Sequence, residues 1–374
     1  MKGALDRSFG PRAARRVWPL LAFILPTLLL AQRSPFNGLD VLPADSTGHY
    51  RILIGGHFHG ESTNRSGYPA ATLLANLDTI NSLGAHLFLC TGDLFMDPVK
   101  DLPRYQRSFF SKLKMPFFNA PGNHDGPGES SDQVFQAQGW RQTVYAPIDP
   151  GGPAESWMEM PGPIVALFDT ERKEGYADSE RIGILTRLLD IVDSTNRATK
   201  AWTQVFIISH RPIWAEDDPQ YSPLFKDNTR STFGTNFRKD VYPLLERIAQ
   251  HAHVYWISGS LGGGAPSSIF FQPHAPNITF IQCAIRDVPR DALLIADVHP
   301  DTVKWSALSL TGQKLRSPET YDAAWWRSKR GKEEGFNWRL LPYLIRTTVL
   351  HRAFWWGAGL MLLLLLFVRR ILRR

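Results

Sequence analysis

Cysteine is nearly absent from this chain. Its 374 residues include two cysteines, Cys90 and Cys283, and each lies in an apolar run typical of a buried strand. We therefore predict two buried thiols that pack as small apolar groups. The sequence leaves open whether they form a disulfide, whereas two cysteines are too few for a cysteine-rich zinc site.

Acidic residues are scarce at both ends of the chain, and basic residues collect there. Residues 1–33 hold six Lys and Arg and one acid, and residues 339–374 hold seven Arg and no acid. The residues between them carry 29 Lys and Arg against 34 Asp and Glu, so the net charge of +7 comes from the ends. Because a nucleic-acid-binding protein would carry its basic patch on the folded domain, we do not expect nucleic acid as a partner. Basic ends beside apolar runs indicate a membrane protein instead.

Long, strongly apolar runs are few and lie near the ends. The first, Val17 to Ala31, has fifteen residues without a charge and follows a basic segment. A membrane span needs roughly 20 residues, so we expect residues 1–33 to be either a signal peptide or an N-terminal membrane anchor, and the pattern leaves both open. The Pro-, Gly- and Ser-rich residues 34–49 are expected to form a linker.

The second apolar run, residues 353–368, has sixteen residues without a charge and five consecutive leucines. A buried core helix is the alternative, but this run has no polar face, so we predict a transmembrane helix. Four arginines follow it and place residues 369–374 in the cytoplasm as a basic tail. The main domain, residues 50–310, would then lie outside the cytoplasm, joined to the membrane by a juxtamembrane segment over residues 311–350.

Strands and helices alternate in the first part of the domain. We expect strands from Arg51 to a Gly-rich loop ending at Gly60, over 86–91 and over 115–120, with helices over 68–83 and 103–113 between them. This order predicts a parallel sheet with right-handed crossovers.

Further strands and helices are expected after residue 162. The expected strands cover 163–169, 203–209 and 254–258, and the expected helices cover 179–192 and 242–251. The remaining strands, over 268–271, 278–285, 292–298 and 302–308, alternate like an antiparallel meander.

Side chains that bind metals or transfer protons follow several of these strands. Carboxylates, amide oxygens and imidazoles at the carboxyl ends of strands are typical of a site in an open α/β sheet. The residues are His57 and His59, then Asp93, then Asn123, His124 and Asp125, and finally His210.

These motifs together resemble the calcineurin-like metallophosphoesterase superfamily over roughly residues 50–310. The similarity lies in Gly92-Asp93, in Gly122-Asn-His-Asp125 about thirty residues later, and in Ile-Ser-His210-Arg-Pro. It implies an α/β fold, a four-layer α/β/β/α sandwich of two mixed sheets. It also implies two metal ions that activate a hydroxide for attack on phosphorus.

The resemblance also implies a role for each residue. Asp93 would bridge both metals, and Asn123 and His210 would bind the second one. His57 and His59 would bind the first. His124 would contact the phosphate or the leaving oxygen, and Asp125 would orient it from behind.

The sequence departs from the family pattern in two places. His57 stands where an aspartate is expected, and the last motif, Gly-His-x-His, is replaced by Gly259-Ser260-Leu261-Gly262. One interpretation keeps one or two divalent ions (Mn, Fe, Zn or Ni), with His251, His253 or His274 as substitute ligands. The other is a decayed site in a non-catalytic scaffold or ligand-binding module for envelope or surface-polymer assembly.

The preferred interpretation is a membrane-anchored, extracytoplasmic, metal-dependent phosphoesterase. Its substrate would be a phosphomonoester or phosphodiester, and its other partner would be the membrane.

Overall fold

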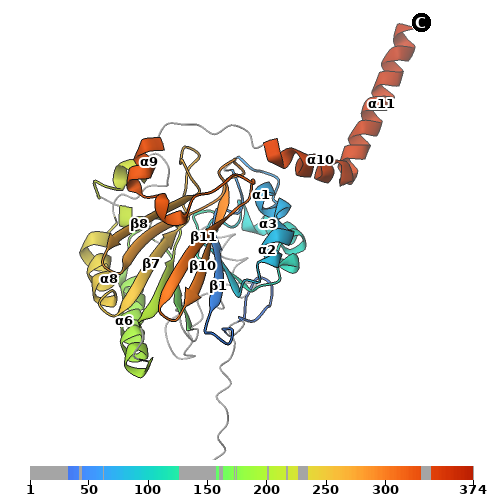
Figure 1. Cartoon of the computed structure of the whole chain (residues 1–374). Coiled ribbons are helices and arrows are strands. Elements are labelled where there is room, and N and C mark those ends of the chain that lie inside the picture. The colour runs from blue at the N-terminus through green and yellow to red at the C-terminus, as the bar shows by residue number, and fades with distance from the viewer. Residues whose placement is uncertain are drawn as a thin grey trace, which may run out of the picture. The chain divides into compact units, whose positions relative to one another are not determined.

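Two mixed β-sheets face each other in the computed structural model, with helices on their outer sides (Figure 1). This confirms the predicted four-layer α/β/β/α sandwich. The structure describes residues 33–41, 44–61, 63–125, 157–159, 163–171, 173, 175–199, 202–215, 218–225, 235–329 and 338–373. The predicted signal peptide or anchor falls outside these residues, apart from its last position.

The first sheet carries the strands that the βα alternation predicted. Its order is β11 (Thr302–Ser309), β10 (Ala292–His299), β1 (Tyr50–Gly55), β2 (Leu87–Cys90) and β3 (Phe117–Asn119). Strands β1, β2 and β3 are parallel, whereas β10 is antiparallel to both of its neighbours. The carboxyl ends of β1, β2 and β3 therefore meet at one edge.

The second sheet is also mixed. Its order is β4 (Trp157–Glu159), β5 (Ile164–Leu167), β6 (Thr203–Ile208), β7 (Ala252–Ser258), β9 (Ile278–Cys283) and β8 (Ile269–Ala275). Strands β5, β6, β7 and β9 are parallel, and β4 and β8 pair antiparallel at the edges.

The predicted antiparallel meander after residue 268 is wrong. Strands β8 and β9 form a hairpin in the second sheet, where β9 is also parallel to β7, whereas β10 and β11 join the first sheet through β1. Alternation of apolar and polar residues is the same in either sheet, so the pattern alone does not assign a strand to its partner. As a result, the segment that follows β9 leaves from the same edge as the loop after β7.

The two sheets pack through aromatic side chains. The Trp305 ring on β11 lies 5.1 Å from the Tyr255 ring on β7 and 5.6 Å from the Phe271 ring on β8, measured between centroids. Both cysteines are buried and free, as the sequence predicted for two packed thiols. The core between the sheets is thus continuous and holds the strand ends in fixed positions.

Helices α2 and α3 lie outside the first sheet, and α6 and α8 lie outside the second (Figure 1). The helices are α1 (Ala71–Ala75), α2 (Leu77–Ser82), α3 (Pro98–Ser108), α6 (Ser179–Thr199), α7 (Ser222–Phe225), α8 (Tyr242–Ile248), α9 (Ala323–Lys329), α10 (Leu341–Leu350) and α11 (Arg352–Leu372). Short single turns cover η1 (Phe110–Lys112), η2 (Ile213–Ala215), η3 (Phe237–Val241), η4 (Pro318–Thr320) and η5 (Trp338–Leu340).

Two expected helices differ from the sequence pattern for local reasons. The helix expected over 68–83 is divided between α1 and α2 at Asn76, whose side-chain amide donates to the Thr72 and Leu310 carbonyls at 2.7 Å each. Helix α3 begins before Pro103, because Asp97 caps it by accepting from the Lys100 N–H and Pro98 takes the first helical position. Proline is well tolerated there, since its missing N–H is not needed in the first turn.

The packed domain extends beyond both predicted boundaries. In the segment expected to be a linker, Phe36 is buried and the Ser34 hydroxyl donates to the Phe117 carbonyl at 2.6 Å. In the segment expected to be juxtamembrane, Trp326 is buried and its ring N–H donates to the Ile269 carbonyl on β8 at 3.0 Å. Residues 318–329 therefore pack on the second sheet.

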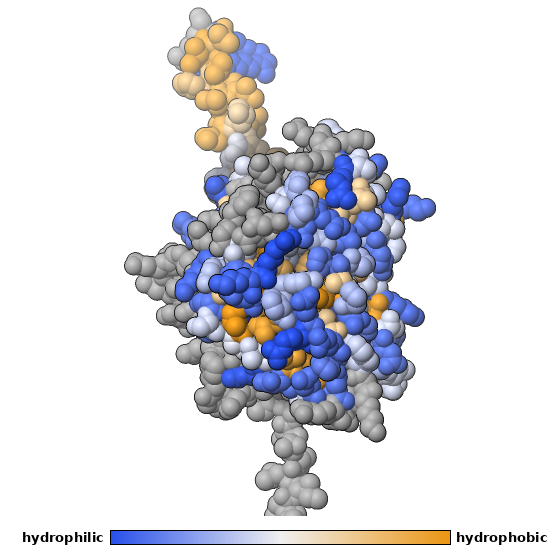
Figure 2. Space-filling view, turned by 90° about the vertical axis from the view of Figure 1, so that its left-hand side faces the viewer, coloured by the Kyte–Doolittle hydropathy of each residue, from blue (hydrophilic) through white to orange (hydrophobic). Residues whose placement is uncertain are grey.

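Helix α11 is long and apolar enough to cross a membrane. It has 21 residues, a mean hydropathy of 1.7 in its most apolar window, and no buried residue there. At 1.5 Å per residue it is about 31 Å long, close to the thickness of a bilayer core. Figure 2 shows that its surface is mostly hydrophobic, whereas the visible face of the domain is mostly hydrophilic.

A buried carboxyl group makes stability depend on pH. Asp291 precedes β10, accepts from the Thr72 hydroxyl at 2.8 Å and from the Arg286 N–H at 3.0 Å, and its burial raises its pKa to about 7. Between about pH 4 and pH 7 the folded chain holds a proton that the unfolded chain releases, so this group's contribution to the free energy of unfolding falls as pH rises.

Replacing Asp291 with asparagine should remove this decrease in the free energy of unfolding with rising pH. We expect the difference in free energy of unfolding between the variant and the parent protein to grow by up to about 4 kcal/mol from pH 4 to pH 7. Urea titrations at several pH values measure it. A difference for Asp291→Asn that does not change with pH would contradict the prediction.

Candidate metal centre

Five loops meet at the edge where the parallel strands end. They follow β1, β2, β3, β6 and β7, and backbone hydrogen bonds tie them together. The His57 N–H donates to the Gly92 carbonyl at 2.8 Å, and the Gly259 and Ser260 N–H groups donate to the His210 carbonyl at 2.9 and 2.8 Å. The side chains at the tips of these loops are therefore held at fixed separations.

The backbone of this edge adopts unusual conformations. His57 and Asp93 have φ values of 61° and 55°, a region that residues other than glycine rarely enter and that costs of order 1–3 kcal/mol. Gly122 allows the β2 and β3 loops to touch, because a Cβ at this position would lie 2.1 Å from the Asp93 nitrogen. Strain of this kind is common where side chains must be aimed at a ligand.

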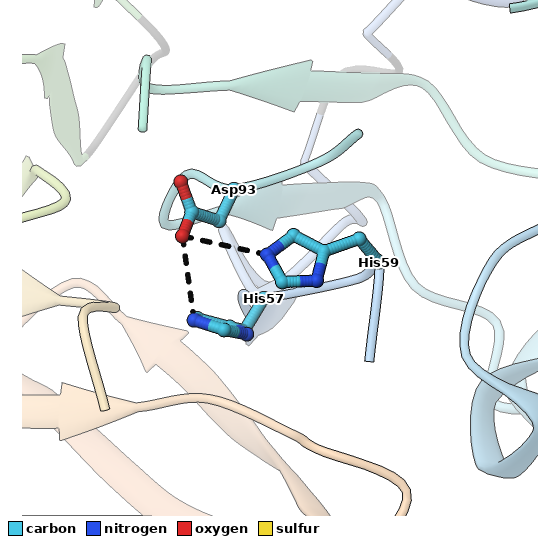
Figure 3. Close-up of side chains that lie close together, drawn as sticks. All are labelled: His57, His59 and Asp93. Atoms are coloured by element: carbon cyan, nitrogen blue, oxygen red, sulfur yellow. Dashed lines mark ion pairs between the residues drawn. The ribbon is translucent and has the colours of Figure 1, made fainter. Parts of the chain in front are cut away.

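Three imidazole nitrogens surround one oxygen of Asp93. The Oδ2 atom lies 3.3 Å from His57 Nε2, 3.5 Å from His59 Nε2 and 3.4 Å from His210 Nε2. Figure 3 shows His57 and His59 pointing toward the Asp93 carboxylate. One ligand atom from each of His57, His59 and Asp93 lies within 4.8 Å of the other two, and all three residues are buried.

Hydrogen bonds fix which nitrogen carries the proton in two of these rings. His57 Nδ1 lies 3.1 Å from the Gly60 carbonyl, and His210 Nδ1 lies 3.0 Å from the Thr91 carbonyl. A carbonyl accepts only, so in each neutral imidazole Nδ1 carries the proton and Nε2 directs its lone pair at Asp93. Metal-binding histidines are oriented in this way by a hydrogen bond from their other nitrogen.

The charge states point in the same direction. Burial lowers the pKa of His57 well below its usual value, and the neighbouring His59 lowers it further. Burial alone would raise the pKa of Asp93, but His210 and the other two imidazoles hold it well below its usual range. The positive charge that stabilises the Asp93 carboxylate can come from protons on these imidazoles or from a divalent metal ion that replaces those protons, so the donor set fits a divalent metal ion.

His59 strengthens this conclusion. It is buried, and among the described residues neither of its ring nitrogens has a hydrogen-bond partner. A buried polar atom without a partner is costly and calls for an explanation such as a ligand.

A second group of donors shares Asp93. His210 Nε2 lies 3.2 Å from Asn123 Oδ1, so the Asn123 amide and the His210 ring approach each other beside the Asp93 carboxylate. All five residues predicted as metal ligands therefore lie together, in two groups that meet at Asp93.

His124 lies next to these donors, while Asp125 has partners other than the expected one. The His124 N–H donates to Asp93 Oδ1 at 3.0 Å, and its ring centroid is 4.9 Å from that of His59. Asp125 was expected to orient the His124 ring, but its carboxylate accepts from the Leu94, Phe95 and Gly122 N–H groups and from the Asn119 amide. It thus fastens the Asp93 loop to the Gly122 loop.

The three substitute histidines do not join the centre. His274 Nδ1 is 2.7 Å from the Tyr221 hydroxyl, His253 packs against Trp202, and His251 Nε2 is 3.8 Å from Asp193. Each of them lies away from the edge where the strands end.

Arg286 is a residue of the centre that the sequence interpretation missed. It follows β9, its Nη1 lies 3.3 Å from His57 Nε2, and it donates to the Leu261 carbonyl at 3.0 Å. Its position three residues after a strand could have indicated a role at this edge of the sheets. The predicted antiparallel meander did not place β9 beside β7, so Arg286 was not assigned to the centre.

The sequence model of a family described as calcineurin-like phosphoesterase matches residues 50–242, just over half of the chain. A comparison with curated proteins finds no match. Among solved structures, the chain is similar to the crystal structure of a dimetal phosphatase from Danio rerio, with 12% sequence identity and a TM-score of 0.44. That similarity covers 70% of this chain and 96% of the other.

Proposed function

This chain belongs to the calcineurin-like phosphoesterase family, and we propose that it is a membrane-anchored, metal-dependent enzyme that hydrolyses a phosphomonoester or phosphodiester. The main support is the set of three imidazole Nε2 atoms around Asp93 Oδ2, because imidazole nitrogens grouped around one carboxylate oxygen are a donor set that suits a divalent metal ion. A bound divalent metal would polarise the phosphoryl group and lower the pKa of water.

The proposed ligands are Asp93, shared by both groups, with Asn123 and His210 on one side and His57 and His59 on the other. Asp93 contributes the negative charge, and the imidazoles contribute neutral nitrogen donors. Nitrogen-rich sites of this kind suit Mn, Fe, Zn or Ni better than Mg or Ca.

His124 is the proposed proton donor to the leaving oxygen. It is half-buried beside the ligands, and its desolvation lowers its pKa below the usual value for histidine. Its backbone N–H donates to Asp93, which fixes the backbone of His124 beside the proposed ligands. From this position its ring would reach the leaving oxygen of a bound substrate. A positioned acid of this type contributes roughly 10²–10⁴-fold to a rate.

Removal of metal tests the function. We expect the full chain, purified in detergent, to hydrolyse bis-p-nitrophenyl phosphate, to lose this activity after dialysis against a chelator, and to regain it with Mn²⁺. The metal content, measured by mass spectrometry, should fall and rise in parallel with the activity, because the ligands are preformed in the fold.

A chain that binds less than about 0.1 metal ion after reconstitution and shows no turnover would contradict the enzyme proposal. Such a result would support the alternative, a non-catalytic scaffold. In that case metal binding would have been lost because Ser260 and Gly262 stand where the family pattern has two histidines.

We further propose that residues 353–368 of α11 span the membrane, with the basic tail in the cytoplasm and the domain outside it. Residues 1–33 would form the signal peptide or an N-terminal anchor. The supporting features are the length and hydropathy of α11 and the arginines at its end.

Cysteine labelling tests the topology. Both native cysteines are buried, so a cysteine introduced at the exposed Lys304 should react in intact cells with a maleimide that does not cross membranes. A cysteine at Arg373 should react only after lysis. The reverse pattern would contradict the proposed orientation, and recovery of the chain in the soluble fraction would contradict the membrane span.

A further inference from the structure

Arg286 lies against the half of the centre that contains His57. Its Nη1 is 3.3 Å from His57 Nε2 and donates to the Leu261 carbonyl at 3.0 Å. A guanidinium group is always charged, so a fixed positive charge stands within contact distance of a predicted metal ligand.

The contact with Arg286 occupies the lone pair that a metal would need. His57 Nδ1 faces the Gly60 carbonyl and carries the ring proton, which leaves one lone pair, on Nε2. When that lone pair accepts from Arg286, it is not available to a metal ion. The bond between His57 and Arg286 and a bond between His57 and metal therefore exclude each other.

Charge acts in the same direction. Because like charges repel strongly in a buried environment, a dication at His57 would be opposed by the adjacent guanidinium. The other group keeps its donors, since His210 Nε2 is 3.4 Å from Asp93 Oδ2 and 3.2 Å from Asn123 Oδ1.

Arg286 belongs to a built structure around the altered loop. Where the family pattern has two histidines, this chain has Ser260 and Gly262, and arginines from the segment after β9 hold the loop backbone. Arg286 binds the Leu261 carbonyl, and Arg290 donates to the Gly262 and Gly263 carbonyls at 3.0 Å each. The guanidinium of Arg286 is thus anchored at the edge of the centre.

We propose that this ligand set is to be narrowed: the centre binds a single divalent metal ion, through Asp93, Asn123 and His210, and His57 and His59 do not bind a second one. Arg286 takes the place of that second ion as the positive group that binds the phosphate of the substrate. This inference rests on the phosphoesterase function proposed above. An arginine suits the role because it offers two parallel N–H donors to phosphate oxygens.

Metal stoichiometry and phosphate binding test the proposal without reliance on turnover. The full chain in detergent is stripped of metal, titrated with Mn²⁺ by calorimetry, and then titrated with inorganic phosphate. We expect one Mn²⁺ per chain, with the electron paramagnetic resonance spectrum of an isolated ion. Arg286→Gln removes the charge but keeps a donor for the Leu261 carbonyl, and this variant should bind a second Mn²⁺. With only the first Mn²⁺ bound, the variant should bind phosphate about 10- to 100-fold more weakly than the parent protein does.

Two further variants control for folding and for charge. Arg290→Gln loses a neighbouring arginine of the same loop and should behave like the parent protein. Arg286→Lys keeps the charge and should still bind one ion.

Two Mn²⁺ ions in the parent protein, or a phosphate affinity of Arg286→Gln equal to that of Arg290→Gln, would overturn the role of Arg286 while leaving the phosphoesterase function intact. An Arg286→Gln variant that still binds one ion would overturn it as well. Absence of any metal in the parent protein would refute the proposed function itself.

Discussion

Replacing Asp93 with asparagine should abolish metal binding at this centre and lower phosphoester turnover by more than about 100-fold. Loss of a residue that only orients a metal ligand costs up to about 100-fold, so loss of a ligand itself should cost more. Asp93 is the residue that both groups of donors share, and its Oδ2 faces three imidazole nitrogens. Without its charge, the remaining neutral donors cannot balance a dication.

Asparagine is the informative substitution. It keeps the shape of the side chain and tolerates the φ of 55° that Asp93 adopts, so the loop should keep its conformation. Any loss of metal can then be assigned to the charge. Metal content by mass spectrometry and turnover of bis-p-nitrophenyl phosphate are the two measurements.

Two other variants separate metal binding from proton transfer. His124→Ala should retain metal and lose roughly 10²–10⁴-fold in turnover, since His124 is the proposed acid and not a ligand. Asp78→Ala, on the exposed side of α2, should change neither measurement. An Asp93→Asn variant with the metal content of the parent protein would show that the ion is held elsewhere.

Replacing Glu171 with alanine should lower the free energy of unfolding by about 3–5 kcal/mol. Glu171 and Arg211 form a buried ion pair in which Arg211 Nε lies 2.8 and 2.9 Å from the two carboxylate oxygens and Nη2 lies 2.8 Å from one of them. Both side chains are at most 4% exposed, so the variant would leave an arginine charge without its counterion in the interior.

The pair also supports the centre, because Arg211 directly follows His210. The Arg211 N–H donates to the Thr170 hydroxyl at 2.9 Å, and this bond holds the β6 loop against the segment that carries Glu171. We therefore expect Glu171→Ala to weaken metal binding as well as stability.

Urea titration measures the effect, with two comparisons. The double variant Glu171→Met with Arg211→Met removes both charges and should recover most of the lost stability, since well-packed apolar residues often replace a buried pair without loss. Arg238→Ala breaks a pair with Asp218 in which Arg238 is 57% exposed, and it should cost less than about 1 kcal/mol. A cost for Glu171→Ala as small as that for Arg238→Ala would contradict the prediction.

The fold class was predictable from the sequence because its main determinants are local. The apolar runs that became β1, β2 and β3 alternate with helical segments, and parallel strands joined in this way have few possible arrangements. The positions of the proposed ligands were predictable for a related reason, since each lies a few residues after β1, β2, β3 or β6 and sites in α/β sheets form where parallel strands end.

The partners of the later strands depended on contacts between residues far apart in the chain. A strand has the same two-residue period in either sheet, so the sequence did not indicate that β9 lies beside β7 while β10 lies beside β1. This assignment brings Arg286 to the centre. The partners of Asp125 were also decided by the fold, because the N–H groups it binds become available only when the β2 and β3 loops meet.

The chain by itself therefore determined which side chains could bind a metal and near which strands they lie, because composition and period are properties of short segments. The tertiary structure alone decided which atoms face one another. It brings three Nε2 atoms within 3.5 Å of one Asp93 oxygen, leaves His59 without a hydrogen bond among the described residues, and sets the Arg286 charge beside His57. Charge balance and hydrogen-bond competition at a metal centre depend on distances of a few ångströms between segments up to 229 positions apart, and only the folded chain sets those distances.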